Sequence, residues 1–428
     1  MNIVIHRGTH EIGGSCVELA TQNSRVLIDA GLPLNDTNTA KEKSAFPLTL
    51  AESLKRTSPP LSGIVISHPH MDHYGLVPGF PPDVPVYSGK VAAALMKLSI
   101  GISHKDETWS NSRMFSSGVR FNVGDFIITP YMMDHSGFDS YAFLIEANGR
   151  RIFYSGDFRD HGRKAQTVKR FLTNPPADID VLLLEGTTVG QSRGEFTLSE
   201  EELESEFAKL INQTAGPVFV TLAGQNIDRV VTVFKAAKRT GRMFVIDPYI
   251  AEVLDQIRLQ YETSGTECKI PHASWPQIKV CYLQNLCRWL KRNGREDILS
   301  RNLKYGVNWR FLSENQSKIV MIVRPSSPDE ILKKGYFDLT KARWIYSMWQ
   351  GYLETDKKLA AFDRDLRAKA TAINYLHTSG HATVEALQAL ATALTPGKII
   401  PIHTAHPEQF SELFSNVVTV NDGIAYPV

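Results

Sequence analysis

The stretch Ser67-His68-Pro69-His70-Met71-Asp72-His73-Tyr74-Gly75 decides how the whole chain is interpreted. It closes an apolar, β-branched run at residues 63–67 and places three histidines and one aspartate within six residues. Zinc binds imidazole nitrogen and carboxylate oxygen, and a loop at the end of a strand can aim several such atoms at one point. This density favours a metal site over a polar surface loop.

Three later residues, His135, Asp157 and His403, stand where predicted strands stop. Taken singly, each has an ordinary explanation: Asp157 as a turn residue, and either histidine as a buried, hydrogen-bonded side chain. The dense run at residues 68–73 is what makes all three candidate ligands.

The pattern of predicted strands and helices changes along the chain. Short β-branched runs at 2–5, 15–19, 25–28, 63–67, 126–129, 141–145, 151–154 and 181–184 predict strands, with one helix near 91–98. From residue 198, helices at 199–211 and 227–239 alternate with strands at 217–221 and 242–246, which predicts βαβ units and a mainly parallel sheet. A helix at 383–394 then leads into a strand at 398–402. The middle of the chain therefore resembles an insertion between two pieces of one domain.

Bulk properties exclude several classes of protein. The 428 residues are 43% hydrophobic and 21% charged, and no apolar run reaches the roughly 18 residues of a membrane helix. The N-terminus lacks the features of a signal peptide, so we expect a cytoplasmic protein without a membrane partner. Four cysteines without a Cys-x-x-Cys pair predict neither a disulfide framework nor a thiolate zinc site.

The formal net charge is only +2, so the overall charge does not indicate a nucleic-acid partner. A local basic stretch at residues 279–310 interleaves arginines and lysines with tyrosines and tryptophans, which fits contact with a single strand. A solvated helix face with inward aromatics explains it slightly better, so we infer no RNA binding from it.

On these motifs the sequence resembles the metallo-β-lactamase superfamily, and specifically its β-CASP nucleases, which include ribonuclease J. The resemblance covers nearly the whole chain and places the family's motifs in order: Asp29, then His68, His70, Asp72 and His73, then His135, Asp157, Glu185, His381 and His403. It implies an α/β fold, with a metallo-β-lactamase αββα sandwich at 1–190 and 372–428. An inserted α/β β-CASP domain is expected at 191–371.

The resemblance also implies two zinc ions per chain, with manganese as the other metal to consider. It assigns His68, His70 and His135 to one ion. The other ion receives Asp72, His73 and His403, with Asp157 as the bridge. Asp29 would support the metal loop.

The catalytic residues implied by the family are Asp72, Glu185 and His381. A pair of zinc ions activates water for attack on a phosphodiester, and the departing sugar oxygen needs a proton. A histidine steadied by a carboxylate can supply that proton near pH 7, which is the role expected for His381 with Glu185.

The segment that contains His377, Ser379 and Gly380 lies just ahead of a predicted helix, where backbone amides can form an anion site. The same residues also suit an ordinary helix N-cap. In ribonuclease J such a segment helps seat a phosphate at the RNA end, so the resemblance implies 5′ exonuclease activity, with endonuclease activity as a second capacity.

Single-stranded RNA is the expected substrate, because the DNA-repair branch of the family has valine where this chain has His403. The resemblance leaves a homodimer open. Three alternatives remain: a DNA nuclease, a hydrolase of a small ester or cyclic nucleotide, and an inactive nucleic-acid-binding scaffold. The zinc core alone serves many reactions, so substrate tests must separate them.

Overall fold

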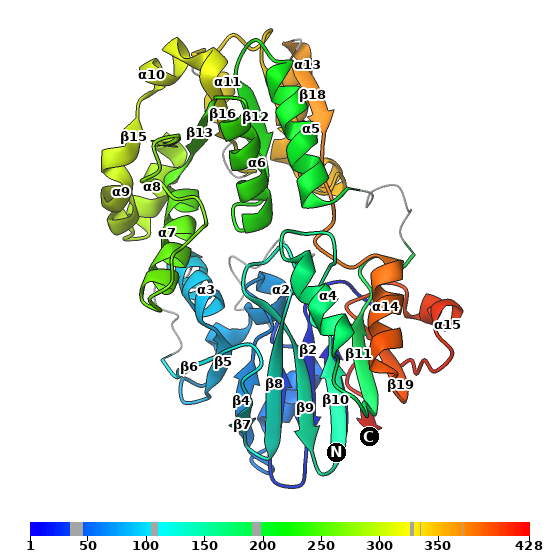
Figure 1. The fold of residues 1–428 in the computed structure, drawn as a ribbon. Coiled ribbons are helices and arrows are strands. Elements are labelled where there is room, and N and C mark those ends of the chain that lie inside the picture. Colours follow the sequence, from blue (N-terminus) through cyan, green and yellow to red (C-terminus); the bar gives the residue numbers. More distant parts are fainter. Residues whose placement is uncertain (35–45, 104–109, 191–197, 326–328, 334, 370) are drawn as a thin grey trace. The chain divides into compact units, whose positions relative to one another are not determined.

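The chain folds into two units, each built around its own β-structure (Figure 1). The computed structural model describes residues 1–34, 46–103, 110–190, 198–325, 329–333, 335–369 and 371–428. Unit 1 comprises Met1–Gly101, Asp106–Arg193 and Gly380–Val428, and unit 2 comprises Ile102–Lys105 and Gly194–Ser379. Unit 1 is therefore assembled from both ends of the chain.

Unit 1 contains two mixed β-sheets. The first has the strand order β20 (Ala425–Pro427), β1 (Asn2–Arg7), β2 (Cys16–Ala20), β3 (Arg25–Ile28), β4 (Leu61–Val65), β5 (Val86–Gly89), β6 (Ser112–Phe115). The second has the order β19 (Lys398–Ile402), β11 (Val181–Glu185), β10 (Arg150–Tyr154), β9 (Ser140–Ala147), β8 (Phe126–Met133), β7 (Phe121–Val123). Strand β19 pairs parallel with β11, with Val181 opposite Lys398, so a late segment completes the second sheet.

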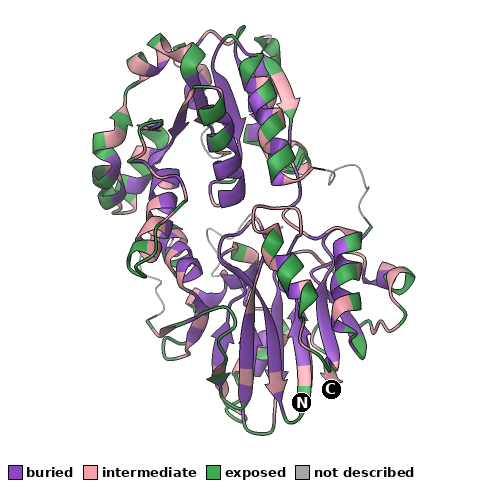
Figure 2. Cartoon of the chain, in the orientation of Figure 1, coloured by how far each residue is buried: buried purple, intermediate pink, exposed green. Residues whose placement is uncertain are grey.

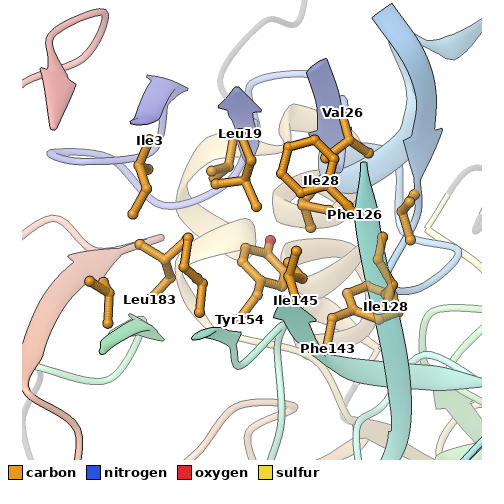
Figure 3. Packing of buried hydrophobic residues seen from close by; sticks show 14 of the residues in the cluster. Ile3, Leu19, Val26, Ile28, Phe126, Ile128, Phe143, Ile145, Tyr154 and Leu183 are labelled. Atoms are coloured by element: carbon orange, nitrogen blue, oxygen red, sulfur yellow. The ribbon is translucent and has the colours of Figure 1, made fainter. Parts of the chain in front are cut away.

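The two sheets of unit 1 pack face to face through apolar side chains such as Leu19, Ile28, Phe143 and Leu183 (Figure 3). Alternate residues of a strand point to opposite faces, so each sheet also has an outer apolar face that must be covered. Helices provide this cover, and the resulting αββα sandwich confirms the predicted fold class.

The helices on the first sheet of unit 1 are α1 (Leu48–Leu54), α2 (Met71–Tyr74) and α3 (Lys90–Ser103). Those on the second sheet are α4 (Ala165–Thr173), α14 (Val384–Leu394) and α15 (Phe410–Leu413). Helix α4 was not predicted, because the sequence interpretation found helical periodicity in this part of the chain only near 91–98. Val168 and Phe171, one turn apart, are its buried contacts with the sheet.

Unit 2 is built on one sheet whose seven strands are all parallel. Their order is β15 (Gly306–Val307), β14 (Ile278–Cys281), β13 (Met243–Ile246), β16 (Ile319–Ile322), β12 (Val218–Thr221), β17 (Arg343–Tyr346), β18 (Ala372–Tyr375). The five inner strands are buried along most of their length (Figure 2), as expected of a parallel sheet covered by helices, whereas the edge strands β15 and β18 are not. The parallel sheet predicted from the strand and helix alternation is confirmed.

The helices of unit 2 are α5 (Glu200–Asn212), α6 (Ile227–Arg239), α7 (Pro248–Glu262), α8 (Gln284–Arg292), α9 (Glu296–Asn302), α10 (Trp309–Glu314), α11 (Asp329–Lys333), α12 (Gly351–Thr355), α13 (Lys357–Ala368). Side-chain caps fix where the longer ones begin: Ser199 forms a capping box with Glu202, and Asn226 and Asp247 cap α6 and α7.

The strand order of unit 2 reverses direction once. From β12 the chain runs through β13 and β14 to β15 at one edge, then returns to β16 and continues through β17 to β18 at the other edge. Strands β13 and β16 are neighbours, and the connections that leave their carboxyl ends run in opposite directions across the sheet.

The basic stretch at 279–310 is partly neutralised within the structure. Arg295 and Arg301 both form ion pairs with Asp297, and Arg301 also pairs with Glu252. The four cysteines are free thiols. Within the described residues, every helix is too short or too polar to cross a membrane.

We predict that Leu183→Ala lowers the free energy of unfolding of unit 1 by about 2–5 kcal/mol. Leu183 is fully buried between the sheets, so truncation leaves a cavity. Leu48→Ala is the matched control, because Leu48 is 83% exposed and its loss should change stability by less than about 0.5 kcal/mol. Denaturant unfolding measures both, and equal losses would contradict this account of the core.

Candidate metal centre

The loop at residues 68–73 is held by the backbone that follows β3. Ala30 N–H donates to the carbonyl of His73 at 2.7 Å, and Leu32 N–H donates to that of Met71 at 3.0 Å. Between them, Gly31 lies so close that a Cβ atom would stand 1.7 Å from the Asp72 carbonyl oxygen. Only glycine allows this approach, so the residue after Ala30 fixes the position of the loop.

Asp29 anchors the loop through its carboxylate. It is fully buried with a φ of 60°, a conformation that is uncommon for a residue with a side chain. Oδ1 accepts from Ser67 N–H, and Oδ2 accepts from Ser67 Oγ, Tyr154 OH and His73 Nδ1, each at 2.7 Å. Asp29 and Ser67 follow strands of the first sheet and Tyr154 ends β10, so this carboxylate joins the two sheets at the site.

The imidazole rings are oriented by hydrogen bonds at Nδ1. His73 Nδ1 donates to Asp29, and His135 Nδ1 donates to the Gly380 carbonyl at 2.5 Å. Ser67 Oγ donates to Asp29 and so accepts from His68 Nδ1 at 3.0 Å. This assignment fixes the tautomer and leaves the Nε2 lone pairs of His68, His73 and His135 directed inward.

A first group of ligand atoms is formed by His68, His70 and His135. His70 Nδ1 lies 3.1 Å from His68 Nε2 and 3.2 Å from His135 Nε2. Burial lowers the pKa of all three rings, that of His70 to about 4, and the neighbouring histidines lower those of His68 and His135 further. Three neutral nitrogens facing one another repel unless a cation lies among them.

A second group is formed by Asp72, His73 and His403. Asp72 Oδ2 lies 3.3 Å from His403 Nε2 and 3.8 Å from His73 Nε2. His403 has a φ of 51°, and its Nδ1 lies 2.8 Å from Thr187 Oγ1. The strained backbone and the threonine contact aim Nε2 of His403 at the same point as Asp72.

Asp157 lies between the two groups. Its Oδ2 is 3.1 Å from His73 Nε2 and 3.8 Å from both His68 Nε2 and His403 Nε2. Burial would raise the pKa of this carboxyl, but His403, His73 and His381 hold it well below its ordinary value. The pKa of Asp72 follows the same pattern. Burial would raise it, but His73 and His403 lower it to about 2.

These donors fit divalent metal ions. Within each group the ligand atoms lie within 4.8 Å of one another, and the set combines imidazole nitrogen with carboxylate oxygen. Nε2 of His73 is buried without a hydrogen bond among the described residues. Burial would lower the pKa of His73, but Asp157, Asp29 and Asp72 raise it well above its ordinary value. A metal ion would displace the proton from His73 and bind the lone pairs that the neutral rings direct inward.

Glu185 and His381 lie beside Asp157. His381 Nδ1 is 3.4 Å from Glu185 Oε2 and 3.6 Å from Asp157 Oδ2. Burial lowers the pKa of His381, but Glu185 and Asp157 outweigh it and raise the pKa to about 9. Glu185 is itself fixed by three backbone N–H groups, from Phe158, Ala382 and Thr187. His381 can therefore carry a proton that it could donate, and Glu185 is a carboxylate held in a fixed position beside it.

The residues expected to bind substrate are placed separately. Gly380, in unit 1, uses its carbonyl to orient His135, as described above. His377 and Ser379 belong to unit 2, where His377 Nδ1 lies 3.5 Å from Arg229 Nη1 and Ser379 is buried. Arg229 Nη2 also donates to the carbonyl of Thr378 at 3.3 Å, so a buried arginine holds this segment in place.

Several supporting residues were missed by the sequence interpretation. Ser67, Tyr154 and Thr187 orient the metal-facing side chains. Asp134 and Arg159 form a fully buried ion pair, and Asp134 Oδ2 also accepts from Gly162 N–H at 2.7 Å. The only signal for Asp134 was its position directly before His135.

Comparison with known proteins agrees with this geometry. Residues 24–220 match the family model described as "Beta-lactamase superfamily domain". Residues 365–417 match "Zn-dependent metallo-hydrolase RNA specificity domain", which spans His381 and His403. The chain belongs to the metallo-β-lactamase superfamily. It is thus a member of a family of metal-dependent hydrolases and is ribonuclease J-like.

Its relatives include ribonuclease J of Mycoplasma genitalium, with 22% identity over 92% of this chain and 66% of that protein. Ribonuclease J of Helicobacter pylori strain B128 is 24% identical over 92% of this chain and 55% of that protein. The transcription termination factor FttA of Methanothermobacter thermautotrophicus is 25% identical over 63% of this chain and 43% of its own length. The chain thus spans about half to two thirds of the two ribonucleases.

One solved structure covers the whole fold. A protein of unknown function from Enterococcus faecalis V583 superposes with a TM-score of 0.77 over 99% of both chains, at 18% identity. This likeness supports the fold of both units.

We predict that Asp29→Asn lowers affinity for zinc about 10- to 100-fold. Asparagine tolerates a positive φ, but its amide group cannot accept hydrogen bonds at both of the former carboxylate oxygens, so His73 loses its orientation. Zinc content and chelator competition measure the effect.

The matched control is Asp180→Asn. Asp180 bonds Arg150 and the Arg151 N–H, and it is not among the residues of the metal centre. Full zinc affinity in Asp29→Asn, or equal loss in both variants, would contradict the anchoring role of Asp29.

Proposed function

We propose that the chain is a zinc-dependent ribonuclease that hydrolyses phosphodiester bonds of single-stranded RNA. One observation carries this proposal: seven nitrogen- and oxygen-donating side chains converge beside a histidine that is held by a buried glutamate. A metal site alone would suit many hydrolytic reactions. The adjacent His381–Glu185 pair adds a proton donor, which a poor alkoxide leaving group needs.

The proposed metal ligands follow the two groups of side chains. His68, His70 and His135 would hold one zinc ion and Asp72, His73 and His403 the other, with Asp157 between them. When bound, zinc ions supply an activated water and stabilise charge on phosphate oxygens. Manganese suits the same mixed nitrogen and oxygen donors.

The chain's own residues would do the remaining work. His381, in its protonated form, would donate to the departing sugar oxygen, while Glu185 keeps the ring in place and favours its charged form. Asp29 would keep the loop rigid so that Asp72 and His73 do not move as the reaction proceeds.

RNA is favoured over other substrates by two findings. The segment that matches an RNA specificity model contains His377, Ser379, Gly380, His381 and His403. The ribonuclease J relatives align over nearly all of this chain. We therefore propose a 5′ exonuclease with endonuclease capacity, in which residues 377–380 help to seat the phosphate at the RNA end.

We also propose a division into two domains, a cellular location and a compatible oligomeric state. Residues 1–190 and 372–428 would form the catalytic metallo-β-lactamase domain and 191–371 the β-CASP domain. The two units of the fold support this division except at residues 372–379, which include β18 and belong to unit 2. An enzyme of cellular RNA would act in the cytoplasm, and a homodimer is compatible with this function.

We predict that His381→Ala and Glu185→Gln each lower RNA cleavage about 10²- to 10⁴-fold while zinc content stays unchanged. Neither side chain belongs to the proposed ligand set, so the proton-transfer step should fail without metal loss. His406→Ala is the matched control, because the His406 ring pairs with the exposed Glu408 and is not among the metal-facing residues. This variant should cleave RNA at the wild-type rate. Wild-type rates in His381→Ala would refute its role.

We also predict a substrate order: 5′-monophosphate RNA, then 5′-hydroxyl RNA, with DNA, lactones, thioesters and cyclic nucleotides left intact. End-labelled RNA reports whether single nucleotides or internal fragments appear first, and Asp72→Ala serves as the inactive control. Small-ester hydrolysis that survives His381→Ala would favour a different hydrolase. Absent cleavage with much less than two zinc ions per chain would favour a binding scaffold.

A further inference from the structure

The carboxyl ends of β13 and β16 in unit 2 form the point where the strand order changes direction (Figure 1). In open parallel sheets, the connections on either side of such a point leave toward opposite edges and open a crevice that commonly binds ligands. Asp247 directly follows β13, and Arg324 lies two residues after β16. These two charged residues meet there, because Arg324 Nε donates to Asp247 Oδ2.

Every acceptor that Asp247 offers is already in use. Its Oδ1 accepts from Ile250 N–H at 2.9 Å as the cap of α7, and its Oδ2 accepts from Arg324. Tyr249 flanks the guanidinium, with 4.8 Å between the Arg324 Cζ atom and the ring centroid, and its hydroxyl accepts from Gln225 Nε2 at 2.8 Å. Arg324 is thus held in one orientation by a carboxylate and an aromatic ring.

One terminal nitrogen of this guanidinium has no acceptor among the described residues. Nη2 of Arg324 is buried and forms no hydrogen bond in the part of the chain that the structure describes. The fully buried Arg229 of the same unit contrasts with it, because it uses all three nitrogens, on Glu200, Ser347 and Thr378. A buried donor of a charged group without a partner is costly, so an acceptor from outside the chain is expected at Nη2.

The backbone of unit 2 approaches this guanidinium closely. Gly224, in the loop after β12, lies against this site: a Cβ there would stand 3.3 Å from both Arg324 Cδ and Tyr249 Cε1. Helices α6 and α7 begin beside the same loops, at the caps Asn226 and Asp247, and helix amino ends favour negative charge. Gln225, Tyr249 and Arg324 are all partly exposed, so a ligand can reach them.

We propose that Arg324, steadied by Asp247 and Tyr249, binds a phosphate group of a nucleotide at this crevice. The fork of a guanidinium matches phosphate oxygens, and the Nη2 hydrogen that points away from Nε is left for such an acceptor. The nucleotide is part of the RNA strand, or it is the mononucleotide that cleavage releases; both sources rest on the proposed ribonuclease function. The site lies wholly in unit 2 and includes none of the metal-facing residues.

The test is calorimetric titration of the full chain with 5′-AMP, adenosine, inorganic phosphate and a cleavage-resistant phosphorothioate RNA decamer. Arg324→Met is expected to weaken binding of a phosphate-bearing probe about tenfold or more and to leave adenosine unchanged. The matched control is Arg310→Met, because the Arg310 side chain is 87% exposed and pairs only with Glu314. It should bind every probe as the wild type does.

The pattern of losses identifies the source of the phosphate. Weaker decamer binding with unchanged 5′-AMP binding indicates the RNA strand, whereas weaker 5′-AMP binding indicates the free mononucleotide. Unchanged binding of all probes in a variant with wild-type melting temperature overturns the proposal and leaves Arg324 as a clamp on Asp247. If Arg324→Met does not fold, Arg324→Lys is read by the same criteria, since lysine keeps the charge but loses the fork.

The outcome is independent of catalysis because binding, not cleavage, is measured. Nucleotide binding that depends on Arg324 in a chain without ribonuclease activity would refute the proposed function alone. Normal RNA cleavage with binding that is indifferent to Arg324 would refute the phosphate site alone.

Discussion

The metal centre depends on one buried carboxylate. Asp29 accepts four hydrogen bonds: two from Ser67 after β4, one from Tyr154 at the end of β10, and one from the His73 ring in the second ligand group. Ligands that project from separate strand ends converge only if those ends are held at a fixed distance. A carboxylate that accepts four hydrogen bonds provides that distance, and the energetic cost of burying it is offset by the bonds it accepts. The strained backbone at Asp29 is maintained by the same bonds.

Much of the fold and the ligand set could be predicted because both rest on local patterns. Alternating and β-branched runs indicate strands, and side chains directly after parallel strands meet at one sheet edge. The loop at 68–73 therefore indicated the site. His135, Asp157 and His403 became candidate ligands only when considered together with that loop. Partition into two groups needed a family resemblance, since spacing along the chain carries no information on which nitrogen faces which.

What could not be predicted depends on partners distant in sequence. Tyr154 and Thr187 are ordinary strand-end residues until the sheets place them beside Asp29 and His403. Arg324 is likewise unremarkable in the sequence, and its position beside Asp247 becomes visible only when β16 is known to lie beside β13. Helix α4 was missed because its apolar side chains are few and its cover of the sheet comes from position, not from a long hydrophobic stripe.

The pairing of β19 with β11 has a consequence for how the protein is made. About half of the chain's length separates these strands, so a ribosome must synthesise all of unit 2 before the second sheet of unit 1 can close. Until then His403 is absent, and the second ligand group stays incomplete. The inserted unit has its own sheet and core and can fold first, as domains do during synthesis. Topology thus delays assembly of the reactive centre until the strand that follows the inserted unit has been synthesised.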